Sequence, residues 1–138
     1  MEEAQYFVEM ERSEDTLEFI IPYDLERHKQ EMSKPEIIYL SIVNEDRLLG
    51  FIILAVEPDT KRVEFRRIVV SSKGKGIGQA AIKEMEQFCL KKLGCRRIWL
   101  DVFESNKRGR HVYEKLGYNH YKSGSYNGKT LLYYDKRL

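Results

Sequence analysis

The segment 63–79 constrains the fold most strongly, because it predicts a buried strand, a glycine-rich turn and a helix in direct succession. Glycines recur at alternate positions of the turn, at Gly74, Gly76 and Gly78. Backbone amides that no side chain covers then lie beside the positive end of the helix dipole. This combination favours binding of a phosphate or pyrophosphate group.

Composition narrows the class of protein. At 138 residues the chain is expected to form a single domain, 1–138, with a real core. Its net charge of +2 gives no electrostatic case for nucleic acid or an anionic membrane as partner. The two cysteines, Cys89 and Cys95, suit neither a disulfide framework nor a four-ligand zinc site, so no metal is expected. With no apolar run long enough to cross a membrane and no signal-peptide pattern, we expect a cytoplasmic protein.

The pattern of apolar residues predicts a mixed α/β fold whose first long strands form an antiparallel meander. The expected elements are a strand at 5–10, two short helices within 13–32 divided by Pro22, strands at 37–43, 48–56 and 63–70, a helix at 76–93, a strand at 97–103, a helix at 105–116, and a hairpin of 118–122 and 130–136 around Asn127-Gly128.

Two alternative interpretations of the glycine patterns are weaker. The residues 76–81 imitate a dinucleotide-binding fingerprint, and Asp101 stands near where a ribose-binding acid would stand. A dinucleotide domain begins with its fingerprint strand, however, whereas a meander precedes this loop. The segment 124–130 is one residue too short for a P-loop and precedes a strand, so a hairpin turn is favoured there.

The glycine turn resembles the pyrophosphate loop of the GNAT superfamily of N-acetyltransferases, whose pattern is Gln/Arg-x-x-Gly-x-Gly/Ala. Lys73 stands where the family usually has Gln or Arg, which keeps a positive charge but loses a planar, multi-donor side chain. The resemblance implies acetyl-CoA as cosubstrate. The residues that it places at the pyrophosphate are Lys73, Gly74, Lys75, Gly76, Ile77, Gly78 and Gln79.

A second motif, Asn106-x-x-Gly109-x-x-x-Tyr113-x-x-x-Gly117-Tyr118, resembles the family pattern Asn-x-x-Ala-x-x-x-Tyr-x-x-x-Gly-Phe at all five places. Positions seven apart return to one helix face about 10 Å along the axis. The resemblance implies that Asn106 binds the pantetheine arm and that Tyr113 reaches the thioester sulfur. Either Ser105 or Asn106 could also cap the helix. A glycine inside a helix costs about 1 kcal/mol, which a close ligand or second backbone at Gly109 would explain.

The same resemblance implies an α+β fold of the GNAT type, with a mostly antiparallel sheet and a V-shaped splay between the strands at about 63–70 and 97–103. It implies direct attack of a primary amine on the acetyl group through a tetrahedral intermediate. The backbone amide of Val70 would stabilise the oxyanion, with Ile68 contacting pantetheine. Tyr113 would protonate the departing thiolate as general acid.

The general base is less clearly indicated. Glu64 on the strand before the loop is the first candidate, with Arg66 or Arg67 as possible ion-pair partners, and Glu104 after the next strand is the second. A carboxylate on a strand is more often solvated or paired than catalytic. His28, His111 and His120 are isolated and are interpreted as surface or structural residues.

Three further questions stay open in the sequence. The basic residues Lys107, Arg108 and Arg110 form either a solvated face or a contact to the 3′-phosphate of coenzyme A. The aromatic C-terminal hairpin leaves a homodimer possible. The acceptor is a small molecule, peptide or protein amine, and a non-catalytic acyl-CoA sensor or interaction module on the same fold is the alternative function.

Overall fold

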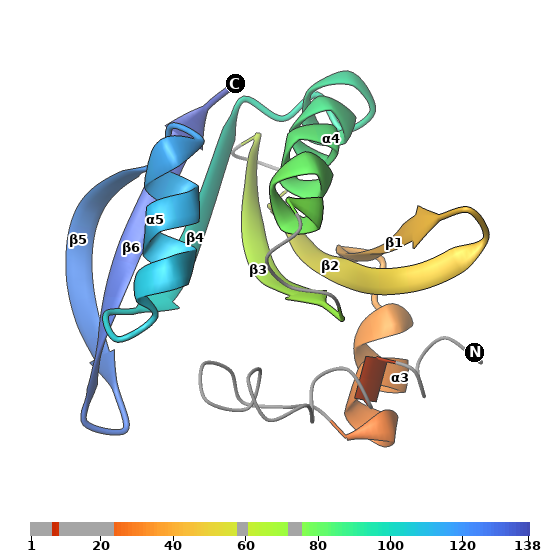
Figure 1. The fold of residues 1–138 in the computed structure, drawn as a ribbon, viewed down its shortest axis with the longest axis horizontal. Helices are drawn as coiled ribbons and strands as arrows, with labels where there is room; N and C mark the ends of the chain where they lie inside the picture. Colours follow the sequence, from red (N-terminus) through yellow and green to blue (C-terminus); the bar gives the residue numbers. More distant parts are fainter. Residues whose placement is uncertain (1–6, 9–23, 58–60, 72–75) are drawn as a thin grey trace.

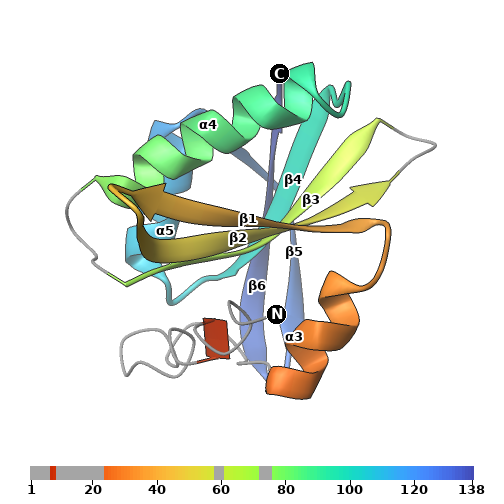
Figure 2. The same cartoon turned by 90° about the vertical axis from the view of Figure 1, so that its right-hand side faces the viewer.

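A six-stranded sheet organises the chain in the computed structural model, which describes residues 7–8, 24–57, 61–71 and 76–138 (Figures 1 and 2). The strand order is β1-β2-β3-β4-β6-β5, and every neighbouring pair is antiparallel except β3 and β4. The elements are α3 (Leu25–Met32), β1 (Ile37–Asn44), β2 (Arg47–Glu57), β3 (Arg62–Val70), α4 (Ile77–Lys91), β4 (Arg97–Phe103), α5 (Lys107–Lys115), β5 (Asn119–Tyr126) and β6 (Lys129–Arg137).

These elements confirm the predicted meander, the two later helices and the C-terminal hairpin. The hairpin turns at Asn127 and Gly128, whose φ angles of 50° and 77° are those of a tight turn with two left-handed residues. The strand predicted at 5–10 is wrong at Phe7 and Val8, which are helical. Short apolar runs do not distinguish strand from helix, and Phe7 is held by ring contacts to Phe51 (4.3 Å) and Tyr39 (5.5 Å). Residues 5–6, 9–10 and 13–23, which include the first of the two predicted short helices, lie outside the described residues.

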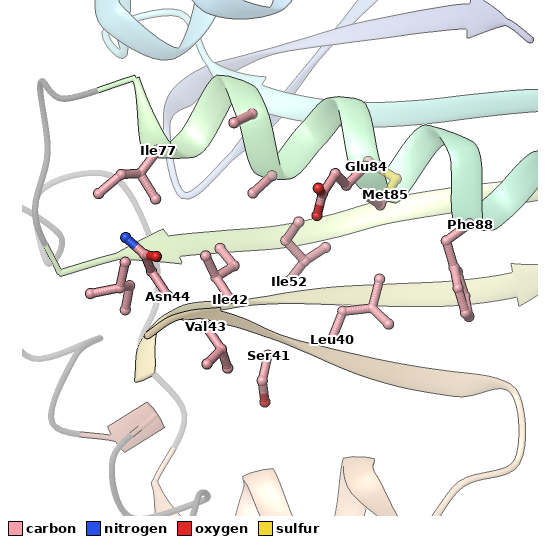
Figure 3. Close-up of a pocket in the computed structure, with 13 residues that line it drawn as sticks. Leu40, Ser41, Ile42, Val43, Asn44, Ile52, Ile77, Glu84, Met85 and Phe88 are labelled. Carbon is pink, nitrogen blue, oxygen red and sulfur yellow. The ribbon is translucent and has the colours of Figure 1, made fainter. Parts of the chain in front are cut away.

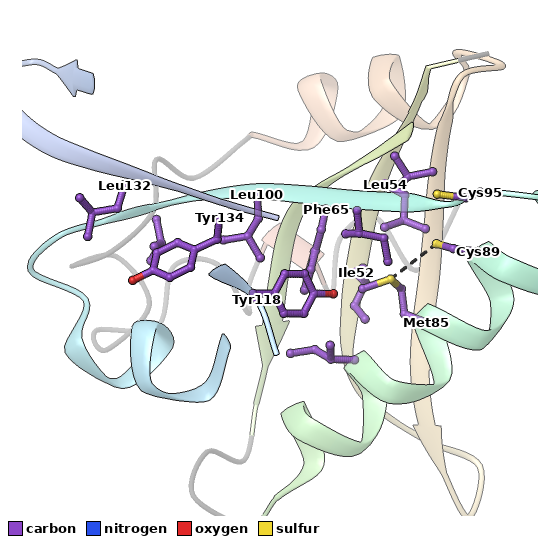
Figure 4. Close-up of a cluster of buried hydrophobic side chains, with 14 residues drawn as sticks. Ile52, Leu54, Phe65, Met85, Cys89, Cys95, Leu100, Tyr118, Leu132 and Tyr134 are labelled. Atoms are coloured by element: carbon purple, nitrogen blue, oxygen red, sulfur yellow. Dashed lines mark hydrogen bonds between the residues drawn. The ribbon is translucent and has the colours of Figure 1, made fainter. Parts of the chain in front are cut away.

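The sheet carries a core on each face. On one face, Ile52 and Leu54 pack with the buried residues of α4 and with α5, and Figure 4 shows this cluster. On the other face, Phe51 and Ile53 pack with Phe7 and with the end of α3. Alternate residues of β2 therefore enter opposite cores, as expected for a strand buried on both sides. Figure 1 shows α4 over the β1–β3 part of the sheet and α5 over the β4–β6 part.

The strands β3 and β4 pair over only three positions, from Arg62↔Arg97 to Glu64↔Trp99, and then diverge (Figure 1). Just beyond this point the register between β2 and β3 shifts, so that Arg66 is the extra residue of a β-bulge. A bulge bends its strand and increases the local twist. The predicted V-shaped splay is thus confirmed, and it opens where β3 bulges.

We predict that Gly50→Ala destabilises the fold by about 1–3 kcal/mol, as overpacking of a close contact does. A methyl group at Gly50 would lie 2.1 Å from the carbonyl oxygen of Val69 on β3. Gly78→Ala is the control, because the nearest atom there is a Val70 methyl at 3.8 Å. Urea unfolding of both variants is the measurement. Equal loss of stability in the two would contradict this account of the contact.

Candidate active site

The free edge of β3 presents backbone donors to the splay. The amide of Ser71 donates to the carbonyl of Leu49 on β2 at 2.7 Å. Amides of successive strand residues point to alternate sides, so those of Ile68 and Val70 are directed away from β2. Since β4 leaves β3 after Glu64, no described strand pairs with these two amides. They form a short row of donors along the open side of the V.

The start of α4 adds a second group of donors. Its N-cap, Gly76, has a left-handed backbone (φ 73°) and no side chain of its own to cap the helix. The first turn holds no acidic residue, so its amides and the helix dipole together favour an anion. Gly78 lies close to the Val70 side chain at the end of β3. The predicted ligands Lys73, Gly74 and Lys75 lie outside the described residues.

Asn106 caps α5. Its Oδ1 accepts a hydrogen bond from the Gly109 amide at 2.9 Å. A methyl group at Gly109 would lie 2.8 Å from Nδ2 of the same asparagine. The capping side chain therefore occupies the space beside this glycine, and neither a ligand nor a second backbone is needed to explain it. The capping role of Asn106 is confirmed, and its Nδ2 keeps its hydrogen-bonding capacity for a ligand.

Tyr113 reaches from α5 across the splay. Its ring packs edge-on against Phe65 of β3, with centroids 5.9 Å apart, and against Tyr118 at 6.1 Å. Burial raises the pKa of the Tyr113 hydroxyl to about 12, and the negative charge of Asp101 adds to this. The hydroxyl therefore stays protonated near neutral pH, as a proton donor must.

Two carboxylates lie on opposite arms of the V. Glu64 on β3 is 17% exposed, and its Oε1 accepts hydrogen bonds from Arg66 Nη2 (2.9 Å) and Nε (3.3 Å). Asp101 is on β4, on the face opposite the buried Leu100 and Val102. Loss of hydration and then the Glu64 charge raise the pKa of Asp101, although its solvent access limits the effect. Arg66, which donates to Glu64, opposes this rise in the pKa of Asp101.

Asp101 is a residue of this site that sequence reasoning missed, since it was considered only as a ribose-binding acid. Its alternation with the apolar residues of β4 already placed it on the opposite face of the strand. The other candidate base, Glu104, lies in an exposed turn after β4. The site therefore brings together Glu64, Asp101 and Tyr113, and leaves Glu104 on its surface.

The remaining chemically interesting residues have structural or surface roles. Arg110 donates to the Glu104 carbonyl (3.2 Å) and to the Tyr134 hydroxyl (3.4 Å), so it is partly engaged within the protein. His28 is fully buried, with its Nδ1 2.7 Å from the Tyr39 hydroxyl, whereas His111 and His120 are exposed.

Cys89 is fully buried in the core, and burial raises the pKa of its thiol to about 12. Among the described residues, no group of His, Cys, Asp and Glu side chains could hold a metal ion. Within the same part of the chain, no helix is long and apolar enough to span a membrane.

A separate groove of about 490 Å³ lies between β1, β2 and α4 (Figure 3). Its lining is mostly apolar, with Leu40 and Ile42 facing Met85 and Phe88, and Glu84 beside them. No residue of β4 or α5 contributes to it. This groove is therefore distinct from the splay that carries Tyr113 and the two carboxylates.

Comparison with known proteins identifies the family. The model of the acetyltransferase (GNAT) family matches residues 4–118. The chain belongs to the GNAT acetyltransferase family. The resemblance of the two sequence motifs to those of the GNAT family is thereby confirmed. The interpretation of the glycine turn as a dinucleotide-binding fingerprint is wrong.

Curated relatives include the spermine/spermidine N(1)-acetyltransferase of Bacillus subtilis, 28% identical over 96 residues, which cover 64% of this chain and 63% of that relative. The ribosomal protein bS18-alanine N-acetyltransferase of Haemophilus influenzae is 31% identical over 80 residues, 58% of this chain and 53% of the relative. The chain thus spans less than two thirds of the length of these relatives.

Solved structures share the fold. The spermidine N-acetyltransferase of Vibrio cholerae, in complex with CoA and spermine, has a TM-score of 0.84 at 16% identity, covering 99% of this chain and 90% of that one. The ribosomal-protein-S18-alanine N-acetyltransferase of Escherichia coli has a TM-score of 0.77 at 17% identity, covering 98% and 86%.

We predict that Asn106→Ala lowers the free energy of unfolding by about 1 kcal/mol through loss of the cap. Asn106→Asp keeps a side-chain oxygen for the Gly109 amide and should retain most of that stability. Thermal and urea unfolding measure both. If Asn106→Asp lowers the free energy of unfolding as much as Asn106→Ala does, the Asn106 side chain stabilises the fold by an interaction other than capping.

Proposed function

We propose that the protein transfers an acetyl group from acetyl-CoA to a primary amine. The observation that supports this best is the row of Ile68 and Val70 amides that no described strand pairs, in a splay that Tyr113 enters by packing on Phe65, in a GNAT-family chain. Donors on one arm and a protonated hydroxyl on the other suit a reaction that builds charge on an oxygen and then on a sulfur.

The residues of the splay fit coenzyme A. Acetyl-CoA supplies a thioester that activates the acetyl group for attack. Its pyrophosphate would bind at the uncapped start of α4, through Gly76, Ile77, Gly78 and Gln79, with Lys73, Gly74 and Lys75 as further ligands. Its extended arm would take the place of a strand beside β3, meeting the Ile68 and Val70 amides. The Nδ2 group of Asn106 would donate to the same arm from α5.

The chemical roles in the transfer can then be assigned to individual residues. The Val70 amide would hold the developing oxyanion, because a backbone donor needs no reorganisation during the reaction. Tyr113 would donate its proton to the departing sulfur and be reprotonated by the second proton that the attacking nitrogen releases as the intermediate collapses. Glu64 would take the proton of the acceptor ammonium, directly or through water, and Asp101 would hold that ammonium by charge. Glu64 is preferred to Glu104 because it lies on the strand that carries the proposed oxyanion donor and near Asp101, whereas Glu104 lies in an exposed turn.

We infer that the acceptor is a cationic aliphatic amine. Glu64 and Asp101 put two carboxylates at the splay; Arg66 offsets part of their charge, and a cationic acceptor would offset more of it. The Bacillus subtilis relative is named for spermine and spermidine, and the Vibrio cholerae structure holds spermine. The Haemophilus influenzae relative is named for the alanine of a ribosomal protein, so a peptide α-amine is the acceptor to compare.

We predict that Tyr113→Phe lowers kcat by about 10²–10³-fold while the Kd for coenzyme A stays nearly unchanged, since it removes only the proton donor. Steady-state kinetics with acetyl-CoA and either spermidine or a peptide with N-terminal alanine would measure this. The wild-type protein should show the higher kcat/KM with spermidine. Unchanged kcat in the phenylalanine variant would remove Tyr113 from the chemistry. Tight binding of coenzyme A with no turnover on any amine would instead favour the alternative function, a non-catalytic acyl-CoA sensor or interaction module.

A further inference from the structure

A row of three side chains crosses the sheet beside the splay, on the face away from α5. Asp101 of β4 pairs with Tyr133 of β6, and Tyr133 pairs in turn with Lys122 of β5. Residues directly opposite one another on neighbouring strands point to the same face of a sheet. Leu132 and Tyr134, which alternate with Tyr133 along β6, belong to the core that α5 covers. The row therefore leads from a carboxylate at the splay, across an aromatic ring, to an ammonium group.

The Tyr133 ring holds the ammonium group of Lys122. Nζ of Lys122 lies 4.6 Å from the centroid of that ring and 6.0 Å from the centroid of the Tyr121 ring. A cation within about 6 Å of an aromatic face is attracted by the charge distribution of the ring. Trp99 stacks beside Tyr133, with the two centroids 6.2 Å apart, and extends the aromatic surface. The row thus contains a place that suits an ammonium group.

Lys122 is held there by aromatic rings alone. The other cation over the Tyr121 ring, Arg97, also donates a hydrogen bond to Asp135 at 2.7 Å. Within the part of the chain that the structure describes, no carboxylate pairs with Lys122, and its side chain is exposed. A ligand that displaces this ammonium group breaks cation–π contacts and leaves no buried charge behind.

The carboxylate end of the row is also open to a ligand. Asp101 interacts electrostatically with Glu64 and Arg66, but no described residue donates a hydrogen bond to it. Neighbouring strands lie about 4.8 Å apart, so an aliphatic chain of a few methylene groups reaches from Asp101 on β4 to the Tyr133 ring on β6. An acceptor whose reacting amine lies at Asp101 brings a second ammonium group to the place that Lys122 holds.

We propose that the Tyr133 ring is a subsite for the second ammonium group of a diamine or polyamine acceptor, and that Lys122 is a specificity-determining residue that competes for this subsite. The proposal rests on the proposed function, in which Asp101 holds the reacting amine. A monoamine uses Asp101 and leaves Lys122 in place. A polyamine gains the contact with Tyr133 only by displacing Lys122, whose charge also repels it. Lys122 therefore reduces the advantage of a polyamine over a monoamine.

The test is the Kd of spermidine and of n-butylamine for the protein saturated with coenzyme A, measured by NMR titration. Both amines have an aminobutyl end, so the ratio of their Kd values reports the preference for further ammonium groups. Lys122→Gln should raise the preference for spermidine by about two- to fivefold, as expected for one exposed cation–π contact. Tyr133→Leu should lower it by a similar factor, whereas Tyr133→Phe should retain it, because a phenyl ring also attracts a cation.

Lys129→Gln is the matched control for charge. It removes one positive charge from the same hairpin, but Lys129 lies over the Phe103 ring, 5.5 Å from its centroid. Its effect on the preference for spermidine should be much smaller than that of Lys122→Gln. Equal effects of the two variants would mean that net charge alone acts, and the proposal is overturned. An unchanged preference in Lys122→Gln or in Tyr133→Leu overturns it as well.

Turnover separates this proposal from the proposed function. Acetylation of spermidine by the wild type, with a preference that none of the variants changes, would overturn only the subsite. Preferences that change as predicted, in a protein that acetylates no amine, would support the subsite and overturn the transfer reaction. If neither amine binds, the subsite is overturned, and acetylation of a peptide with N-terminal alanine then decides whether the transfer reaction stands.

Discussion

The short pairing between β3 and β4 is the constraint on which the rest of the site depends. These parallel strands share three residue pairs at one end and then separate, while β2 continues to pair with β3 to its end. The separation leaves the Ile68 and Val70 amides without a strand partner. Backbone donors left unpaired inside a protein cost free energy, so a ligand that satisfies them gains affinity. In the proposed function, coenzyme A occupies the place of the missing strand.

The two helices on the common face of the sheet hold the separated strands in position. Met85 and Cys89 of α4 belong to the same core as Phe65 of β3 and Leu100 of β4. Tyr113 of α5 packs on Phe65, so it spans the opening near its narrow end. Because these contacts are shared between the two arms, the residue proposed as proton donor is positioned by the core itself. On the opposite face, Arg66 ties the bulged strand to α3.

The sequence allowed most of the helices and strands, and the protein family, to be predicted. Helical spacing, the Asn127-Gly128 turn and two motifs indicated the elements and the family. Local patterns could not show that Asp101 faces Glu64, because that contact depends on how far two strands diverge. Nor could they show that Glu31 meets Arg66, since one lies on a helix and the other on a bulge far along the chain. Phe7 and Val8 escaped prediction because a short apolar run suits a helix as well as a strand.

The claim that the free edge of β3 receives coenzyme A is tested most directly by amide hydrogen exchange, resolved residue by residue with NMR. Val69 is the internal reference, because its amide is directed toward β2. Saturating coenzyme A should slow exchange at Ile68 and Val70 by about tenfold or more, with little change at Val69. Unchanged exchange at Ile68 and Val70 under saturating coenzyme A would contradict the account.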